Sequence, residues 1–353
     1  MPHRILRTIA LTAVVVYIAA CGTAPPSSPV SPPGNSPLAT NQAASGPELG
    51  AWWDPDRKGL RTEFGVAGAA YQGPPAYNDG SYTGAAVCMR KSIALLTTSS
   101  GALFSVNLPQ GRPQVVATSG IPGASIAFSP SCAAALVYAS GKSHALLVQN
   151  LFSTPKTGSV TLPAGVSAAA VSDSGSILVA VPGADGTAAI QLLSGSSSTV
   201  QQVTVLSRFG GMAFLPGADT ALLADAAANS VFEAAHVTGN MSLAQIASEA
   251  DGVSNPVAIA ASADGRFAAV ANKIGSTVLR LDLSGQSPPT QTACHCTPTE
   301  LEPLAGNLVF RLNEAGAGTV WAFDGDASAP RVVFIPTDRP TAQAASRAPG
   351  AHQ

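Results

Sequence analysis

Residues 257–272, Val-Ala-Ile-Ala-Ala-Ser-Ala-Asp-Gly-Arg-Phe-Ala-Ala-Val-Ala-Asn, decide the fold of this chain together with residues 276–283, Ser-Thr-Val-Leu-Arg-Leu-Asp-Leu. The first stretch holds two short runs of small and β-branched residues, which suit strands that pack on both faces. Between these runs, Asp264-Gly265 provides the positive φ that a tight hairpin turn requires. The second stretch is apolar again, so the unit is a series of short strands joined by turns.

The same unit recurs along the chain. Its copies begin near Ala85, Ser125, Ser167, Gly211, Val257 and Leu301. Successive starts are 40, 42, 44, 46 and 44 residues apart. Turn residues recur as well, as Asp-Ser-Gly at 173–175, Asp219 and Gly306-Asn307. Four-stranded units repeated at this period predict an all-β fold with a single β-propeller, and a β-sandwich or a β-solenoid explains the near-constant step less well.

The number of blades depends on the start of the chain. Residues 50–56 and 59–66 predict one more hairpin, which we interpret as the outer half of a blade. Residues 67–82 are candidates for the rest of that blade, because the last repeat already has outer strands at 319–324 and 331–335. The sequence therefore predicts six full repeats and a partial one, giving six or seven blades with seven favoured.

One repeat carries a family resemblance. Residues 256–283, with a Ser-x-Asp-Gly-Arg turn at 262–266, resemble the YVTN and NHL class of propeller repeats. WD repeats differ, since they open with Gly-His and end the third strand with Trp-Asp. The resemblance implies a propeller over residues 49–336 and says little about activity.

The N-terminus has the layout of an exported precursor. Arg4 and Arg7 precede the apolar run 11–19, which is too short to span a membrane. Residues 18–21, Ile-Ala-Ala-Cys, resemble the lipobox of bacterial lipoproteins, with Ile where Leu is usual. The resemblance implies a signal peptide over 1–20 and a lipid, such as palmitate, on Cys21. An ordinary signal peptide is the alternative.

Composition extends this interpretation beyond the leader. Residues 21–48 are rich in Pro, Ala and Ser, with no charge over 22–47, which predicts a disordered tether; the tail, 337–353, is similar. Gly22, rather than Asp, follows the cysteine, which by resemblance implies the outer membrane if the host has one. The chain has 11% charged residues and a net charge of −2, so we expect no nucleic-acid partner.

Four cysteines lie beyond the leader. An even number in an exported domain predicts disulfides, for which three pairings exist. Inner strands of adjacent blades lie close together, which favours Cys88–Cys132 and leaves Cys294–Cys296, a pair that needs a turn around His295. A metal site at residues 294–296 is the alternative, but no second ligand cluster accompanies it. We expect no cofactor.

Nothing in the sequence calls for an active site. It lacks a Gly-x-Ser-x-Gly elbow, a P-loop and a dinucleotide fingerprint, so we expect no enzyme and no catalytic residue. His144 and His236 fall on expected third strands, where a structural role is favoured. Some six-bladed propellers are calcium-dependent hydrolases, and oxygen ligands for such a site would be Asp173, Asp264, Asn255 and Asn272. Turn chemistry already explains the two aspartates.

Five aromatic residues gather near the start of the propeller in a chain with 5% aromatics: Trp52, Trp53, Tyr71, Tyr77 and Tyr82. Blade packing accounts for them, and the functional alternative is an exposed patch that anchors a partner.

These features favour a non-enzymatic, monomeric propeller that is lipid-anchored on the extracytoplasmic side of a bacterial membrane and binds an envelope protein. One alternative is a metal-dependent hydrolase or small-molecule binder that uses the central channel. Another is a surface module for adhesion or glycan recognition.

Overall fold

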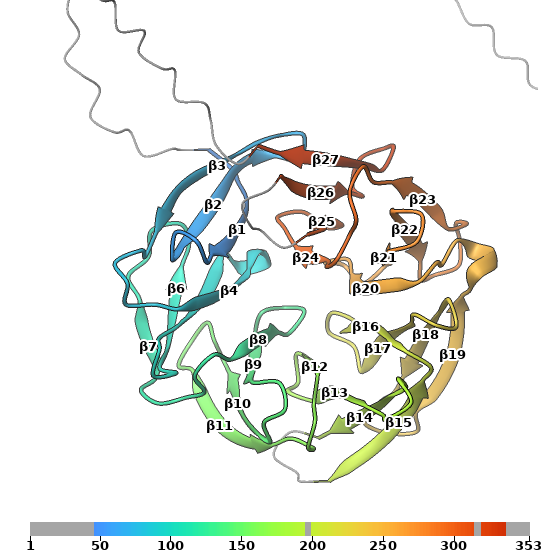
Figure 1. Ribbon diagram of the computed structural model, residues 1–353, viewed down its shortest axis with the longest axis horizontal. Coiled ribbons are helices and arrows are strands. Elements are labelled where there is room, and N and C mark those ends of the chain that lie inside the picture. Colours follow the sequence, from blue (N-terminus) through green and yellow to red (C-terminus); the bar gives the residue numbers. More distant parts are fainter. Residues whose placement is uncertain (1–45, 195–198, 314–318, 337–353) are drawn as a thin grey trace, which may run out of the picture. The chain divides into compact units, whose positions relative to one another are not determined.

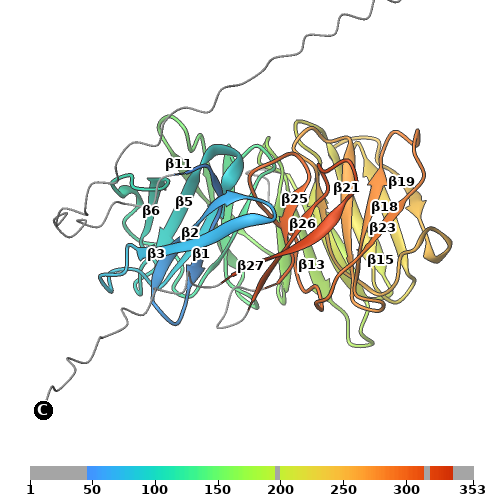
Figure 2. The ribbon, with the colours of Figure 1, turned by 90° about the horizontal axis from the view of Figure 1, so that it is seen from above.

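The computed structural model describes residues 46–194, 199–313 and 319–336, which form seven antiparallel sheets around a central channel (Figure 1). Figure 2 shows this ring from its edge. Six sheets have four strands, and the first sheet has three. The prediction of an all-β propeller with six full repeats and a partial one is confirmed, and the number of blades is seven.

Each blade runs from an inner strand at the channel to an outer strand at the rim. Blade 1 consists of β1 (Glu48–Asp54), β2 (Gly59–Val66) and β3 (Ala69–Ala76), and blade 2 consists of β4 (Gly84–Cys88), β5 (Ile93–Thr97), β6 (Leu103–Asn107) and β7 (Gln114–Ala117). Blade 3 consists of β8 (Ser125–Phe128), β9 (Ala134–Tyr138), β10 (His144–Gln149) and β11 (Lys156–Thr161). Blade 4 consists of β12 (Ala168–Val171), β13 (Ile177–Pro182), β14 (Ala188–Leu193) and β15 (Val200–Leu206). Blade 5 consists of β16 (Phe209–Phe214), β17 (Thr220–Asp225), β18 (Ser230–Ala235) and β19 (Ser242–Ala247). Blade 6 consists of β20 (Pro256–Ala261), β21 (Phe267–Asn272), β22 (Thr277–Asp282) and β23 (Thr290–Ala293). Blade 7 consists of β24 (Glu302–Pro303), β25 (Val309–Arg311), β26 (Val320–Asp324) and β27 (Arg331–Ile335).

Two short 3₁₀ turns, η1 (Met89–Lys91) and η2 (Glu249–Asp251), are the helical elements of the described residues. Neither has the length or hydrophobicity of a segment that crosses a membrane.

The first blade corrects one prediction. Residues 50–66 do form a hairpin, but the prediction that it is the outer half of a blade is wrong, because β1 is the inner strand at the channel. The outer strand is β3, which comes from the segment 67–82. The burial pattern explains the difference: β1 and most of β2 are buried on both faces, as inner strands between neighbouring blades must be.

The hydrophobic core lies between the blades rather than at the centre of the ring. The described residues form seven apolar clusters, each of which joins two neighbouring blades. Between blades 4 and 5, for example, Leu178 and Ile190 pack with Phe214 and Leu223. The small and β-branched residues of the repeat therefore serve strands that contact a second sheet on each side.

Turns at one end of the inner strands tie the blades together. Gly175 and Gly265 have φ values of 90° and 72°, so the predicted need for positive φ is confirmed. Asp173 does more than form its own turn, because its carboxylate accepts hydrogen bonds from the backbone N–H groups of Ser131 at 2.8 Å and Gly217 at 2.9 Å. One side chain of blade 4 thus joins blades 3 and 5.

The ring closes at a seam between blades 1 and 7. Among the described strands, none from blade 1 is hydrogen-bonded into the sheet of blade 7. The seam is instead held by the Ala305 N–H, which donates to the Leu49 carbonyl at 2.7 Å, and by Arg331, which donates to the Ala67 carbonyl at 3.3 Å. An apolar cluster that includes Leu49 and Leu304 fills the space between the two sheets.

Candidate functional site in the central channel

The inner strands of all seven blades surround a cavity of about 630 Å³. This volume lies within the range of about 300–1,000 Å³ that is typical of small-molecule sites. Most of its wall is small and apolar, and the alanines are Ala51, Ala85, Ala86, Ala127, Ala169, Ala170, Ala213, Ala260 and Ala261. The repeat places these residues there because the first strands of several copies, such as β4, β12 and β20, are rich in Ala.

One corner of the wall is charged. Glu300, Glu302 and Arg311 line the cavity from blade 7. The Nε of Arg311 donates a hydrogen bond to Glu300 Oε1 at 2.9 Å. Glu302 faces Arg311 as its register partner across β24 and β25, but within the described residues no hydrogen bond or ion pair joins Glu302 to another side chain. Burial raises the pKa of Glu302 to about 7, while Arg311 lowers the pKa and Glu300 raises it.

A further carboxylate lies behind this corner. Glu63 on β2 has no exposed surface, and neither of its carboxylate oxygens has a hydrogen-bond partner. Gly50 makes room for it, since a Cβ at Gly50 would come within 2.8 Å of Glu63 Oε2 and 2.5 Å of Leu304 Cδ2. Burial raises the pKa of Glu63 to about 7, although Arg311 and Arg61 both lower it.

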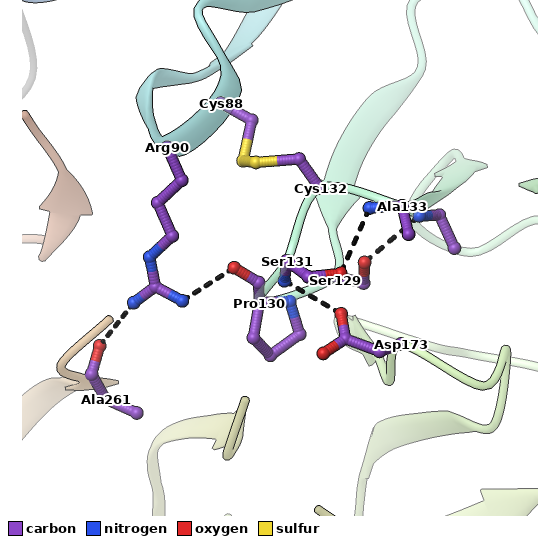
Figure 3. Close-up of a disulfide and its surroundings, with 10 residues drawn as sticks. Cys88, Arg90, Ser129, Pro130, Ser131, Cys132, Ala133, Asp173 and Ala261 are labelled. Carbon is purple, nitrogen blue, oxygen red and sulfur yellow. Dashed lines mark hydrogen bonds between the residues drawn. A yellow bond between two sulfur atoms is a disulfide. The ribbon is translucent and has the colours of Figure 1, made fainter. Parts of the chain in front are cut away.

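Arg90 crosses one end of the cavity (Figure 3). It lies on η1, and its guanidinium donates to the carbonyl oxygen of Pro130 at 2.6 Å and to that of Ala261 at 3.0 Å. Pro130 belongs to blade 3 and Ala261 to blade 6, so one side chain of blade 2 links blades on opposite sides of the channel. Arg90 thereby obstructs the end of the channel at which the inner strands finish.

A disulfide lies beside this arginine (Figure 3). Cys88, at the end of β4, is bonded to Cys132, in the turn after β8. A second disulfide joins Cys294 to Cys296 around His295. The predicted disulfides are thus present, and such bonds indicate an oxidising, extracytoplasmic compartment.

The four oxygen ligands considered for a metal do not come together. Asp173 and Asp264 hold turns, and Asp264 accepts the Ser262 hydroxyl at 2.6 Å. Asn255 accepts a hydrogen bond from the Arg208 side chain. Asn272 accepts one from the Ser254 N–H and donates one to the Gly252 carbonyl. None of the four lines the cavity. The described part of the chain contains no group of three or more His, Cys, Asp or Glu side chains placed to bind a metal ion.

The two tryptophans belong to the channel wall. Trp52 is only 4% exposed, and its Nε1 is buried without a hydrogen-bond partner. Trp53 is half-buried and lines the same cavity. Arg61 lies 6.0 Å from the centre of the Trp52 ring. Trp52 is therefore closed to a protein partner.

The three tyrosines pack within blades 1 and 2. The Tyr71 ring lies 5.9 Å from that of Phe64, and the Tyr77 hydroxyl donates to the Gly111 carbonyl at 2.7 Å. Tyr82 packs edge-on against a phenylalanine of β6 at 5.7 Å. The five aromatic residues therefore do not share one exposed surface.

The histidines stand apart from the cavity. His144 is exposed on β10, where its Nδ1 lies 3.3 Å from the Ser159 hydroxyl. His236 follows β18 with a φ of 54°. Neither contributes to the channel wall.

Sequence reasoning missed the charged corner. The segment Thr299-Glu-Leu-Glu-Pro303 contained a signal, because two glutamates flank the predicted start of an inner strand in a chain with few charges. No comparable signal marked Glu63 or Arg90. Their neighbours come from distant blades and meet only when the ring closes.

No family model matches this sequence, and no curated protein matches it. Solved structures match its fold. A functionally unknown protein from Desulfotomaculum acetoxidans is 15% identical with a TM-score of 0.55, over 83% of this chain and all of that chain. A streptogramin B lyase is 15% identical with a TM-score of 0.51, over 73% of this chain and 84% of that one.

A third structure, the dihydro-heme d1 dehydrogenase NirN, is 13% identical with a TM-score of 0.50, over 71% of this chain and 55% of that one. The lyase and the dehydrogenase differ in activity, and at such low identity the likeness shows the fold alone. The comparisons therefore support the seven-bladed β-propeller fold that the repeat predicted.

Proposed function

We propose that this chain is an exported propeller lipoprotein that binds another protein of the bacterial cell envelope. The observation that supports the proposal is the N-terminal sequence that ends in Ile18-Ala-Ala-Cys21, whose cysteine would carry the lipid. The disulfides of the ring support an extracytoplasmic location. The leader, Cys21, most of the tether and the tail 337–353 lie outside the described residues, so the anchor rests on the sequence.

The physics of the anchor favours stable membrane attachment. Acyl chains contribute about 0.8 kcal/mol for each CH₂ group buried in the bilayer. Two acyl chains therefore hold a protein on the membrane far longer than one chain does. The Pro-rich segment 22–47 would act as a semi-rigid spacer between the membrane and the ring. The propeller could then meet a partner through a face or through its rim.

The rim of blades 4 and 5 supports binding of a protein. The outer strands β15 and β19 contain no charged residue, although exposed edge strands are usually protected by charge or proline. They expose Val200, Val205, Leu243 and Ile246 by 36–51%. Exposed apolar residues on unprotected edges are typical of surfaces that partners cover.

Cell fractionation tests the anchor. The Cys21→Ser variant should leave the membrane fraction, because it lacks the thiol that carries the lipid. A Ser27→Ala variant in the tether should remain with the membrane. Cys21→Ser that stays membrane-bound would show that the lipid assignment is wrong.

Cross-linking in intact cells tests the partner. We expect a stoichiometric envelope protein to be recovered with the wild-type chain and lost with the double variant Val205→Lys and Leu243→Lys. The matched control, Gln114→Lys and Thr157→Lys, adds the same charge to the outer strands β7 and β11, away from β15 and β19, and should retain the partner. Recovery of the chain alone from wild-type cells would contradict the interaction role.

The cavity favours a second candidate function, binding of a small molecule in the channel. Its volume and its charged corner are the observations in favour. Two of the similar propellers are described as enzymes, a lyase and a dehydrogenase, so the fold accommodates small ligands.

A further inference from the structure

The charged corner of the cavity carries an excess of negative charge. Glu300, Glu302 and Glu63 all interact with the guanidinium of Arg311, and Glu63 also interacts with that of Arg61, which is itself paired with Asp54. Arg311 is 9% exposed, donates its Nε to Glu300 and leaves Nη1 without a partner. Arg311 is therefore bonded to Glu300, and within the described residues no hydrogen bond or ion pair joins Glu302 to a cation. Ionised carboxylates in such surroundings are unfavourable unless a cation reaches them.

Glu302 is the carboxylate that a ligand can reach. It is half-buried and lines the cavity, whereas the oxygens of Glu63 are enclosed by protein. Glu300 is already bonded to Arg311. An incoming positive charge would therefore pair with Glu302.

We propose that the cavity binds an organic cation, an alkyl- or arylammonium compound whose charge pairs with Glu302 and whose apolar body lies against the alanine-lined wall. Away from its charged residues the wall offers apolar contact and aromatic side chains, among them Trp53, Phe128 and Tyr138. Arg90 obstructs one end, so the ligand enters from the other end and its length is limited by the cavity. This proposal is independent of the lipid anchor and of the envelope partner.

The surroundings of Glu302 make this binding depend on pH. Burial and Glu300 raise its pKa, Arg311 lowers it, and the result is about 7. The neighbouring wall segments 51–53 and 259–261, from β1 and β20, are uncharged. An ammonium ion pairs with the ionised carboxylate and itself stays protonated, because its pKa is about 10. Its affinity should therefore fall about tenfold from pH 8 to pH 6, as Glu302 takes up a proton.

Calorimetry on the full-length protein in non-ionic detergent tests the proposal with three probes of one shape: 2-phenylethylammonium, 2-phenylethanol and phenylacetate. We expect the ammonium probe to bind at one site and the neutral and anionic probes to bind about tenfold more weakly or not at all. Glu302→Gln should weaken the ammonium probe about tenfold, which corresponds to one lost ion pair in a partly buried site. The exposed Glu249→Gln control should bind like the wild type.

Three results would overturn the proposal: equal binding of the three probes, no binding of the ammonium probe, or an affinity that Glu302→Gln leaves unchanged. If Glu302→Gln does not fold, the wild-type measurements at pH 6 and pH 8 decide instead. An affinity that is the same at both pH values would then exclude Glu302 as the partner of the cation.

Discussion

Asp225 and Glu63 are two buried carboxylates in opposite surroundings. Asp225, at the end of β17, accepts hydrogen bonds from the backbone N–H groups of residues 207–208 and 227–228 at 2.6–3.2 Å. Burial raises its pKa, but these four amides outweigh burial and the pKa is lowered. Glu63 has no such donors, and burial dominates. Ionisation therefore stabilises the fold at Asp225 and destabilises it at Glu63.

The Glu63 carboxyl predicts a pH-dependent stability. Its folded pKa of about 7 exceeds the ordinary 4.5, so its favourable contribution is complete below pH 4.5 and is lost as the pH rises through 7. The loss amounts to about 3 kcal/mol. Because Glu63→Gln cannot ionise, the variant should exceed the wild type in stability by about 1–3 kcal/mol at pH 8 and match it near pH 4.5.

Urea unfolding of both proteins at the two pH values measures this difference. The exposed Glu249→Gln variant is the control and should follow the wild type at each pH. A Glu63→Gln variant that is less stable than the wild type at pH 8 would contradict this prediction. It would show that the ionised Glu63 carboxylate stabilises the folded protein.

At the scale of strands and turns, the sequence predicted most of the structure. The inner strands begin within two residues of the predicted repeat starts, because the Ala-Val strand and the Asp-Gly turn are local signals. The order of strands in blade 1 was not predictable in the same way. Whether residues 50–66 lie at the channel or at the rim depends on what packs against both faces, and that is set by distant blades.

The candidate site was harder to predict for the same reason. Arg90 bonds to Ala261, 171 residues away, and Glu63 acts on Arg311 across the seam. No spacing along the chain reveals such pairs. The disulfides could be predicted from the sequence because cysteines are few and the repeat places the ends of adjacent inner strands close together.

The two disulfides should differ in their effect on stability. Cys88–Cys132 spans 44 positions and joins two blades, whereas Cys294–Cys296 spans 2. A longer closed loop removes more entropy from the unfolded chain, so replacing the first pair by serine should lower the free energy of unfolding by about 2–4 kcal/mol. Replacing the second pair should lower it by about 1.5 kcal/mol or less.

Denaturant unfolding of the two double variants, each compared with the wild type under oxidising conditions, measures these effects. Under reducing conditions the wild type and both variants should converge. Equal losses for the two pairs would mean that loop length does not govern their contribution.

At the scale of the whole molecule, the ring depends on seven interfaces of similar chemistry, but the chain continues directly across only six of them. The seventh, the seam, relies on side-chain packing and a few hydrogen bonds. Gly50 lies against Leu304 across this seam, where a Cβ would come within 2.5 Å of Leu304 Cδ2.

Gly50→Ala therefore tests the seam. Its Cβ would meet Leu304 and Glu63 closer than atoms normally approach, so these two buried side chains would have to shift at the seam. We expect a loss of about 1–3 kcal/mol in the free energy of unfolding and faster proteolysis within blade 1. Gly158→Ala, where a Cβ meets nothing within 4 Å, should change stability by less than about 0.5 kcal/mol.

The seam also sets an order of events during biosynthesis. Blade 1 leaves the ribosome first, and the sheet that covers it on one side, blade 7, is made last. Until then Leu49 and the rest of that face have no partner, and the nascent chain exposes an apolar surface during translation. Closing the ring joins blades 1 and 7, which lie near opposite ends of the sequence. Contacts between segments so far apart in sequence form slowly, because closing such a long loop costs entropy. The same open face is where a chaperone would bind, and where two unfinished chains could pair with each other instead.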